Sequence, residues 1–531
     1  MIYNVIDLFA GAGGLSLGFK QTGQVKIVAA AENNLNARKT YKRNFKLARL
    51  YSDVRTIDYA ELQDTVGPVD IVIGGPPCQG FSNANRQHTT VISMNNRLVK
   101  EYVRELNPKA FVMENVAMLR SQVHRFFLEE QDLDNERIMA LPLSEDKIEI
   151  LPECVNFSNS IAFLETARAE MGYAWAESFY KIINILYRYR INPAKFDTTL
   201  EKYQKKLIAQ LNEILKITAE TEELNVLQEN DAKMAKAILQ YIDQKDTFDD
   251  AVLAISNSIM MQRAIMKIKE LTDNDIHIFE YKEDNGSLVA VVKSYPVMDY
   301  IRAILENEPY NYTLSENTLN AIHYGAPQRR ERFIIVGLKK EMNAKYIAPE
   351  IKFTEGNYRT VYDAIADIQD VIPVTEVTGD YIELEAHPNA TGLEKELRGR
   401  ALYNHITTAT RETAMARFKA LKAGENFHDL DPELKTTYSN ADRTQNTIYM
   451  RLKYNEPSGT VVNVRKSMWI HPELDRAISI REAARLQTFP DTFIFEGTKD
   501  SQYQQVGNAV PPYLAKAIAD SVISILNNAT E

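Results

Sequence analysis

The chain has very little cysteine: its 531 residues include only two, Cys78 and Cys154. Two cysteines cannot build a disulfide framework or a four-cysteine metal site. Cysteine used this sparingly is typical of a reducing compartment, so we expect a cytoplasmic protein in which Cys78 remains a thiol. None of the usual spacings of metal ligands occurs either, so no metal is expected.

Long apolar runs and a basic leader are also missing. No apolar run approaches the ~18 residues that a membrane-spanning helix needs. The first residues, Met1 to Asp7, lack the basic segment of a signal peptide and enter a strand pattern at once. We therefore expect no contact with a membrane.

Positive charge is in the minority, with 62 Lys and Arg against 72 Asp and Glu and a net charge of −10. This balance argues against a protein coated in basic surface, although a local basic cleft would still hold a nucleic acid. The hydrophobic fraction of 45% and the charged fraction of 25% are ordinary for a globular protein. The length predicts about three or four domains.

The most informative stretch that is present is Gly74-Gly75-Pro76-Pro77-Cys78-Gln79-Gly80-Phe81-Ser82. It follows an apolar run at 69–73 that predicts a buried parallel strand. Prolines fix the backbone before the cysteine, and the glycines permit turns that a Cβ would forbid. Open α/β sheets place active sites at the carboxyl ends of strands, where this thiol stands. Taken alone, the stretch fits a nucleophile and a small buried side chain equally well.

A glycine-rich turn lies near the N-terminus, between a predicted strand at 3–9 and a helix that begins within Ala10–Phe19. Such a turn is a weak indication of a nucleotide-type cofactor. The next strand, 26–31, ends in Glu32, which is placed to accept hydrogen bonds from ribose hydroxyls. A solvated charge at a strand end is the common alternative. After a helix at 37–45, Asp53 could bind the exocyclic amine of an adenine.

A further strand at 110–113 ends in Glu114, followed by Asn115 and Val116. If this strand neighbours the one before Cys78, the carboxyl group of Glu114 should lie near the thiol. The polar stretch 83–96 lacks apolar periodicity and, directly after a nucleophile, suggests a lid.

With these motifs the sequence resembles the DNA cytosine-5 methyltransferase family, which uses S-adenosylmethionine. The resemblance implies an α/β fold, with a Rossmann-like methyltransferase sheet, a small target-recognition domain and a large mainly helical insertion. The matching motifs stand in family order at 7–14, 77–79, 114–116, 328–332, 481–490 and 505–512.

The resemblance also implies the roles of individual residues. The catalytic residues would be Cys78, Glu114, Arg330 and Arg332. The cofactor site would be formed by Phe9, Ala10, Gly11, Ala12, Gly13, Gly14, Glu32, Asp53, Val54, Pro77, Leu98, Asn508 and Ala509. Contacts to DNA would come from Gln79, Ser82, Gln328 and Thr460.

The implied reaction methylates C5 of a cytosine that is flipped out of double-stranded DNA, with S-adenosylhomocysteine as the second product. Thiolate addition to C6 activates C5, Glu114 meets N3 and Arg332 meets O2. Arg330 would order this cluster and the neighbouring DNA. A protective role in a restriction–modification pair fits a bacterial member of the family.

The chain departs from compact family members between Glu114 and Gln328, which are 328 − 114 = 214 residues apart. We expect the catalytic domain at 1–120, 296–348 and 476–531, a mainly helical insertion at 121–295 and a target-recognition domain at 349–475. Residues 201–300 carry 12 Lys and Arg against 18 Asp and Glu, so they bind phosphate poorly. Contact with a partner protein, self-association and passive surface elaboration all remain open for the insertion.

Three other functions fit the sequence less well. A tRNA cytosine-5 methyltransferase would carry a Cys-Phe-Thr tripeptide, for which this chain has no third cysteine. A non-catalytic DNA-binding relative would lack the cysteine or the glutamate, and both are present. A nicotinamide oxidoreductase would need the G-x-G-x-x-G spacing, from which Gly11-Ala12-Gly13-Gly14 departs, and would leave Cys78 and Glu114 unexplained.

Overall fold

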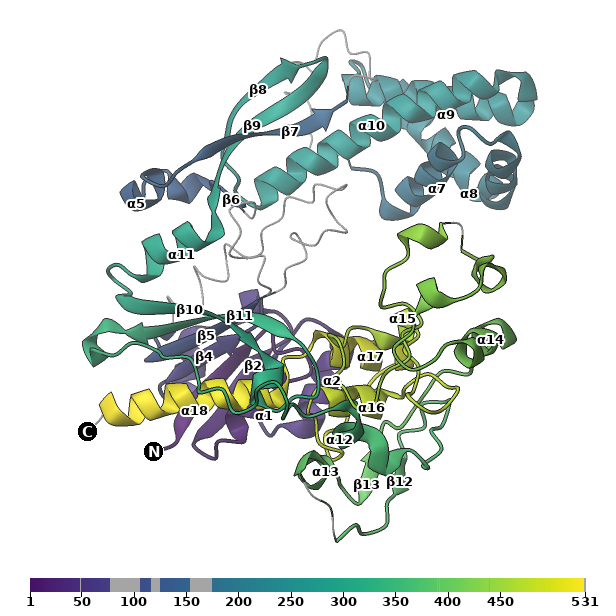
Figure 1. Ribbon diagram of the computed structural model, residues 1–531. Helices are drawn as coiled ribbons and strands as arrows, with labels where there is room; N and C mark the ends of the chain where they lie inside the picture. Colours follow the sequence, from purple (N-terminus) through teal and green to yellow (C-terminus); the bar gives the residue numbers. More distant parts are fainter. Residues whose placement is uncertain are drawn as a thin grey trace. The chain divides into compact units, whose positions relative to one another are not determined.

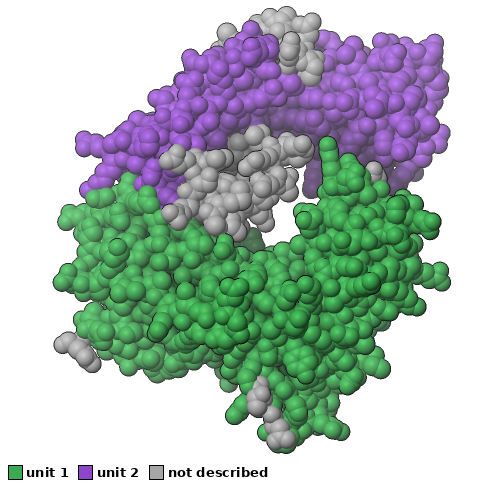
Figure 2. Space-filling view, in the orientation of Figure 1, with its two compact units in different colours: residues 1–81, 95–121, 301–531 green, residues 82–94, 122–300 purple. Residues whose placement is uncertain are grey.

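The computed structural model describes residues 1–47, 49–76, 106–115, 125–152, 174–388, 390, 392–438 and 440–529. The chain divides into two compact units (Figure 2). Unit 1 is built from Met1–Phe81, Asn95–Ser121 and Ile301–Glu531, and unit 2 chiefly from Gln122–Tyr300. In this division the segment 349–475 does not separate from the rest of unit 1, so the expected domain boundaries stay predictions.

Unit 1 contains a seven-stranded sheet in the order β10-β11-β5-β4-β1-β2-β3. The first five strands of the chain pair in parallel, and β10 and β11 are antiparallel additions at one edge. The sheet confirms the predicted α/β fold. The strands are β1 (Tyr3–Leu8), β2 (Val25–Ala31), β3 (Arg49–Tyr51), β4 (Ile71–Gly74), β5 (Ala110–Asn115), β10 (Tyr312–Asn320) and β11 (Glu331–Lys339).

The strand order reverses direction between β1 and β4. From β1 the chain moves outward through β2 and β3, then returns to the other side of β1 with β4 and β5. In open α/β sheets, ligands bind beyond the carboxyl ends of the strands at this switch point. Two loops singled out in the sequence begin there, the glycine loop after Leu8 and the cysteine loop after Gly74.

The C-terminal helix α18 (Pro512–Ala529) packs against α1 (Gly14–Lys20), as Figure 1 shows. Glycine permits the close approach, because a Cβ at Gly18 would lie 2.3 Å from the Cβ of Ala515 and 2.5 Å from the Pro512 carbonyl. One segment of the described chain, Lys499–Ala529, is long and apolar enough to cross a membrane by length and composition. Its most apolar window is 67% buried, as expected of a core helix.

The remaining elements of unit 1 are mostly short. A two-stranded sheet pairs β12 (Tyr381–Glu383) with β13 (Ala401–Tyr403). The helices near the central sheet are α2 (Leu35–Asn44), α3 (Tyr59–Val66) and α17 (Lys499–Asn508). The others are α12 (Val361–Ile365), α13 (Gly392–Leu397), α14 (Glu412–Ala420), α15 (Val464–Ser467) and α16 (Ile480–Leu486).

Unit 2 contains a four-stranded antiparallel sheet, which the sequence analysis did not predict. The strand β9 lies between β6 and β7 and also pairs with β8. The described part of the insertion is mainly helical, as predicted, with this one sheet in addition. The strands are β6 (Arg125–Phe127), β7 (Ser144–Leu151), β8 (Ile278–Asp284) and β9 (Ser287–Pro296).

Four longer helices of unit 2 share an apolar core (Figure 1). Apolar residues at three- and four-residue intervals predict helices at 161–190 and 200–215. The first range is described only from residue 174 onward, and the helix in the second range is longer than predicted. The four are α7 (Glu177–Arg188), α8 (Pro193–Glu220), α9 (Val226–Asp243) and α10 (Phe248–Asp273). Two shorter helices are α5 (Glu136–Met139) and α11 (Val297–Leu305), which leads into unit 1.

Candidate active site

The loop after β1 has a strained and partly open backbone. Phe9 has a φ of 60°, while Gly11 and Gly13 have φ values of 53° and 92°. A left-handed φ costs a residue with a Cβ on the order of 1 kcal/mol, so Phe9 is held there by its surroundings. A Cβ added at Gly11 would meet no atom within 4 Å. The loop thus offers a strip of backbone that a ligand can approach closely.

Glu32, directly after β2, is tied to this loop through its carboxylate. Its Oε2 accepts a hydrogen bond from the backbone N–H of Gly11 at 2.8 Å, and its Oε1 accepts one from Asn34 at 2.7 Å. An ionised carboxylate can accept about four hydrogen bonds. Two such bonds position Glu32 at the loop and leave acceptor capacity for the ribose hydroxyls that the sequence predicted.

Beneath the loop, the carboxyl group of Asp7 is buried with two hydroxyl groups. The Ser16 hydroxyl donates to Oδ2 of Asp7 at 2.6 Å and lies 2.5 Å from the Tyr41 hydroxyl. Burial raises the pKa of Asp7 to about 7, and the hydrogen bonds from Ser16 and Tyr41 oppose this rise. The cluster joins β1 to α1 and α2 and supports the glycine loop from below.

The other predicted cofactor residues lie around the same edge of the sheet or outside the described chain. Asp53 and Val54 follow β3, and the N–H of Glu32 donates to the Tyr51 carbonyl two residues before Asp53. Asn508 ends α17, and Ala509 contacts the loop, because a Cβ at Gly14 would lie 3.3 Å from the Ala509 Cβ. Ala10 and Ala12 are buried within the loop. Pro77 and Leu98 lie outside the described residues.

Glu114 and Arg332 form an ion pair at the carboxyl end of β5. Nε of Arg332 lies 2.6 Å from Oε1 of Glu114, and the two side chains are only 14% and 13% exposed. Register explains the pairing, because β11 runs antiparallel to β5 and Phe333, the residue after Arg332, pairs with Asn115. The structure therefore brings together two residues that are far apart in the sequence.

The described start of the cysteine loop lies against this pair. A Cβ added at Gly75 would come within 2.9 Å of Oε2 of Glu114. The side-chain amide of Asn115 donates to the Pro76 carbonyl at 3.3 Å. The adjacency of β4 and β5, on which the expected proximity of Glu114 and Cys78 depended, is confirmed. Cys78 itself, with Gln79 and Ser82, lies outside the described residues.

Arg330 is almost completely buried, with 1% of its surface exposed. Its two terminal nitrogens donate to the carbonyl groups of Val461 (2.7 Å) and Gly507 (2.8 Å). Burial and the charge of Arg332 lower the pKa of Arg330, and Glu114 opposes them. This location suits a residue that orders the cluster by joining three chain segments.

Gln328 and Thr460 belong to one short pairing of segments. Gln328 bridges to Ser458, and the Thr460 hydroxyl donates to the Arg329 carbonyl at 2.7 Å. The Gln328 side chain is fully buried and bonds Gln487 and the Leu486 carbonyl. A direct contact of Gln328 with DNA would break these bonds, so its burial favours a positioning role. Thr460 is exposed.

Several residues of this site were missed by sequence reasoning. Gly75 and Asn115 connect the cysteine loop to Glu114, and Gln487 connects Gln328 to the Val506 carbonyl. All three lie inside motifs, but their neighbours come from other segments. Only the tertiary arrangement reveals these contacts.

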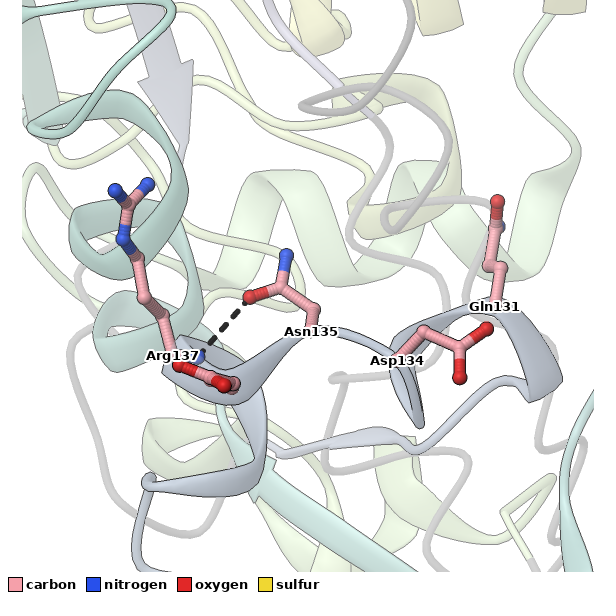
Figure 3. Close-up of a pocket in the computed structure, with 5 residues that line it drawn as sticks. Gln131, Asp134, Asn135 and Arg137 are labelled. Carbon is pink, nitrogen blue, oxygen red and sulfur yellow. Dashed lines mark hydrogen bonds between the residues drawn. The ribbon is translucent and has the colours of Figure 1, made fainter.

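A shallow pocket of about 470 Å³ lies elsewhere, in unit 2 (Figure 3). Its lining residues cluster around α5, where Oδ1 of Asn135 accepts a hydrogen bond from the N–H of Arg137. None of them belongs to a motif, and the carboxylates Asp134 and Glu136 are exposed to solvent, so the chemistry points to the strand ends instead. The lining residues are Gln131, Asp134, Asn135, Glu136 and Arg137.

The chain also matches a known protein family. The family model for C-5 cytosine-specific DNA methylases matches residues 3–132 and 293–524. The two matched ranges include every described motif at the strand ends. The unmatched residues 133–292 fall within unit 2.

Individual relatives resemble the chain over almost its whole length. The Type II methyltransferase M.DdeI of Desulfomicrobium norvegicum is 26% identical, over 98% of this chain and 88% of the relative. The Type II methyltransferase M.AgeI of Thalassovita gelatinovora is 25% identical, over 97% and 98%. A crystal structure of a prophage-encoded E. coli protein, described as a DNA modification methyltransferase, has a TM-score of 0.53 at 19% identity and covers 99% of both chains. At this sequence identity, the similarity to the E. coli protein shows a shared fold.

Proposed function

The chain belongs to the C-5 cytosine-specific DNA methylase family, and from this premise we propose that it methylates C5 of cytosine within a specific sequence of double-stranded DNA. The observation that carries the proposal is the Glu114–Arg332 pair beside the backbone that leads to Cys78. A carboxyl group, a guanidinium and a thiol are the three groups that a cytosine ring needs for activation at C5.

We assign S-adenosylmethionine as the methyl donor and S-adenosylhomocysteine as the product. The open backbone at Gly11 fits the approach of a nucleoside. Glu32 and Asp53, at successive strand ends, would hold the ribose hydroxyls and the adenine amine. When bound, the cofactor would supply an electrophilic methyl group on a sulfonium centre. The rest of the site would be formed by Phe9, Ala10, Ala12, Gly13, Gly14, Val54, Pro77, Leu98, Asn508 and Ala509.

The protein groups would activate the base by covalent catalysis. The thiolate of Cys78 forms a bond with C6, and the electron pair of the C5–C6 double bond becomes available at C5. Charge also moves toward N3 and O2, where Glu114 and Arg332 hold the ring. After C5 has taken the methyl group, loss of the C5 proton and elimination of the Cys78 thiolate restore the aromatic ring.

A base within a duplex cannot reach the strand ends, so the cytosine would be flipped out at a cost of a few kcal/mol. Arg330 would order the catalytic cluster from its buried position, and Thr460, Gln79 and Ser82 would contact the DNA. Gln328 would act through its bonds to Gln487 and Leu486. The stretch 83–96, for which the sequence suggests a lid, lies outside the described residues.

The biological setting follows by analogy with the relatives. M.DdeI and M.AgeI are named Type II methyltransferases. We infer that this chain protects DNA in the same kind of restriction–modification system, in the cytoplasm.

Incubation with plasmid DNA and S-adenosylmethionine, followed by bisulfite sequencing, tests the function. We expect 5-methylcytosine at one recurring sequence. The Cys78→Ala variant should give none, while the control variant Cys154→Ala should retain the activity. Methylation of added tRNA without methylation of the plasmid would overturn the proposal.

A further inference from the structure

The charge of unit 2 is distributed unevenly along the chain. Residues 122–300 contain 20 Lys and Arg against 31 Asp and Glu, a net charge of −11. Within this acidic segment, residues 180–206 contain seven Lys and Arg against two Asp and Glu, a net charge of +5. The seven are Lys181, Arg188, Arg190, Lys195, Lys202, Lys205 and Lys206. With Arg263 from α10, they form what we call the basic patch.

The basic patch lies on α7, on the turn that follows it, on the first half of α8 and, through Arg263, on α10; Figure 1 labels these helices. All eight of its basic side chains are exposed. Lys195, Lys202 and Lys206 point to the same side of α8, within about 40° of one another at 3.6 residues per turn. The helices beneath are held by a common apolar core, so the charges stand on a fixed surface.

Two arginines of the basic patch are held by one tyrosine ring. The guanidinium carbons of Arg190 and Arg263 lie 4.3 Å and 5.0 Å from the ring centre of Tyr187. Arg263 also donates to the side-chain oxygen of Asn184 at 3.1 Å. Stacking on an aromatic ring orders a guanidinium while leaving most of its N–H groups available.

Most charges of the basic patch are not neutralised by the protein. Lys181 pairs with Glu177, but no described carboxylate lies within 4 Å of the other seven basic groups. Of the two acidic residues in 180–206, Asp197 bonds Lys245 and the Tyr241 hydroxyl instead. The patch is therefore a positive surface within an acidic unit, where one would expect neighbouring carboxylates to cancel it.

We propose that the basic patch binds the sugar–phosphate backbone of duplex DNA outside the methylated sequence. Phosphates are the ligand that unpaired, ordered arginines and a row of lysines fit best. The acidic remainder of unit 2 repels DNA, so the patch also limits how unit 2 can meet it. The choice of DNA rests on the proposed function; the phosphate-binding chemistry rests on the patch alone.

The test compares the intact protein with the double variant Arg190→Gln/Arg263→Gln in binding a fluorescent duplex that lacks the target sequence. Each phosphate contact adds about 0.9 to the slope of log affinity against log salt. We expect the variant to bind more weakly and its slope to be less steep by about 1.8. Between about 50 and about 200 mM salt, its affinity should therefore fall about tenfold less than that of the parent.

Three controls make the result specific. The variant Arg190→Lys/Arg263→Lys keeps the charge and should keep most of the slope. Lys233→Gln/Lys269→Gln removes two exposed lysines of unit 2 that pair with Glu229 and Asp273, and should leave the slope unchanged. Methylation of a short duplex that contains little flanking DNA should persist in all variants, which separates a failure of this proposal from a failure of the proposed function.

An unchanged affinity and slope in Arg190→Gln/Arg263→Gln would overturn the proposal. So would an unchanged slope together with a shift in sedimentation, because the basic patch would then contact another protein chain.

Discussion

The two units of this protein build their interiors from different side chains. Unit 1 buries charged groups, and Arg330, Arg481 and Arg485 are among its largest fully buried side chains. In the described part of unit 2, the buried charged side chains are three carboxyl groups, and no arginine or lysine is buried. The three are Glu129, Asp132 and Asp231.

The buried arginines of unit 1 join segments that lie far apart in the sequence. Arg485 bonds both oxygens of Asp491 (2.8 and 2.7 Å) and the Ala364 carbonyl at 3.0 Å. Arg481 bonds the carbonyls of Tyr403, Pro490 and Phe493. A buried charge that lacks its partners is strongly destabilising. Such bonds therefore favour the one tertiary structure in which all the partners are present.

The helices of unit 2 are held mainly by apolar contacts among α7, α8, α9 and α10. Many combinations of aliphatic side chains fill such a core equally well. The motif-bearing unit is therefore specified by particular charged residues, and the insertion by a pattern of apolar residues. Accordingly, the family model matches most of unit 1 and omits 133–292.

The largest effect should come from breaking the buried charge of unit 1. Arg485→Met removes both charged hydrogen bonds from buried Asp491 and leaves Arg481, at 3.9 Å, as its nearest cation, so we expect a loss of about 3–5 kcal/mol in the stability of unit 1. The chain has only two tryptophans, Trp469 in unit 1 and Trp175 in unit 2. In a Trp175→Phe background, urea unfolding followed by Trp469 fluorescence measures unit 1. A loss of less than about 1 kcal/mol in the unfolding free energy would show that unit 1 does not depend on this buried charge, and the difference between the two units would disappear.

Removing a carboxylate from the active site should affect catalysis more than stability. Glu114→Gln leaves Arg332 without its charged partner and removes the acid–base group, so we expect kcat to fall roughly 10²–10³-fold. The control Glu280→Gln changes an exposed carboxylate of unit 2. Single-turnover methylation of a duplex measures both variants. Equal rates would show that Glu114 takes no part in the reaction.

In unit 2, replacing a buried carboxyl group should stabilise the fold at neutral pH. The Trp175 indole donates to Oδ2 of Asp231 at 2.8 Å, and burial raises the pKa of Asp231 to about 6. The unfolded chain ionises near the ordinary value of 3.8, so Asp231 costs stability as the pH rises from about 4 to about 6. We expect Asp231→Asn to gain on the order of 2 kcal/mol above pH 6 and nothing near pH 4.

This measurement uses Trp175 fluorescence in a Trp469→Phe background, with and without the Asp231→Asn change. A gain that does not depend on pH would mean that ionisation of Asp231 is not the cause. If Asp231→Asn lowered the stability of unit 2 at every pH, the Asp231 carboxyl group would be required for stability, as we expect of the buried charges in unit 1.

The smallest effect should come from displacing the Glu114 carboxylate without removing it. A Cβ at Gly75 meets only the end of this flexible side chain, so Gly75→Ala should leave stability almost unchanged and lower kcat about tenfold. Gly74→Ala is the contrast, because its Cβ would lie 2.5 Å from the backbone carbonyl of Leu8 and should destabilise the sheet. Thermal melting and turnover together separate the two. A normal kcat in Gly75→Ala would indicate that the exact position of Glu114 is unimportant.

How much could be predicted from the sequence differed between the units for a physical reason. In unit 1, apolar runs marked β1, β4 and β5, and the residues after them marked the site, because parallel strands end at one edge. The partners of Arg330 could not be predicted, since Val461 and Gly507 meet it only in the folded chain.

In unit 2, helical periodicity was readable, but the sheet was not. The strands β7 and β9 pair between residues more than a hundred positions apart, and β7 is mostly polar on one face. The local sequence pattern of a strand does not predict which distant strand it pairs with. The basic patch was likewise hidden, because the acidic total of 201–300 masks Lys202, Lys205 and Lys206, and the cations at 181–195 lie just before that range.

The central claim is that the Cys78 thiolate adds to the cytosine ring while Glu114 and Arg332 hold it. The most direct measurement is covalent trapping on duplex DNA that carries 5-fluorocytosine at the target, in the presence of S-adenosylmethionine, since fluorine at C5 blocks elimination. We expect an adduct that survives denaturation, whose mass spectrum locates the DNA on the peptide containing Cys78. No adduct from the parent protein, or an equal adduct from Cys78→Ala, would contradict the claim.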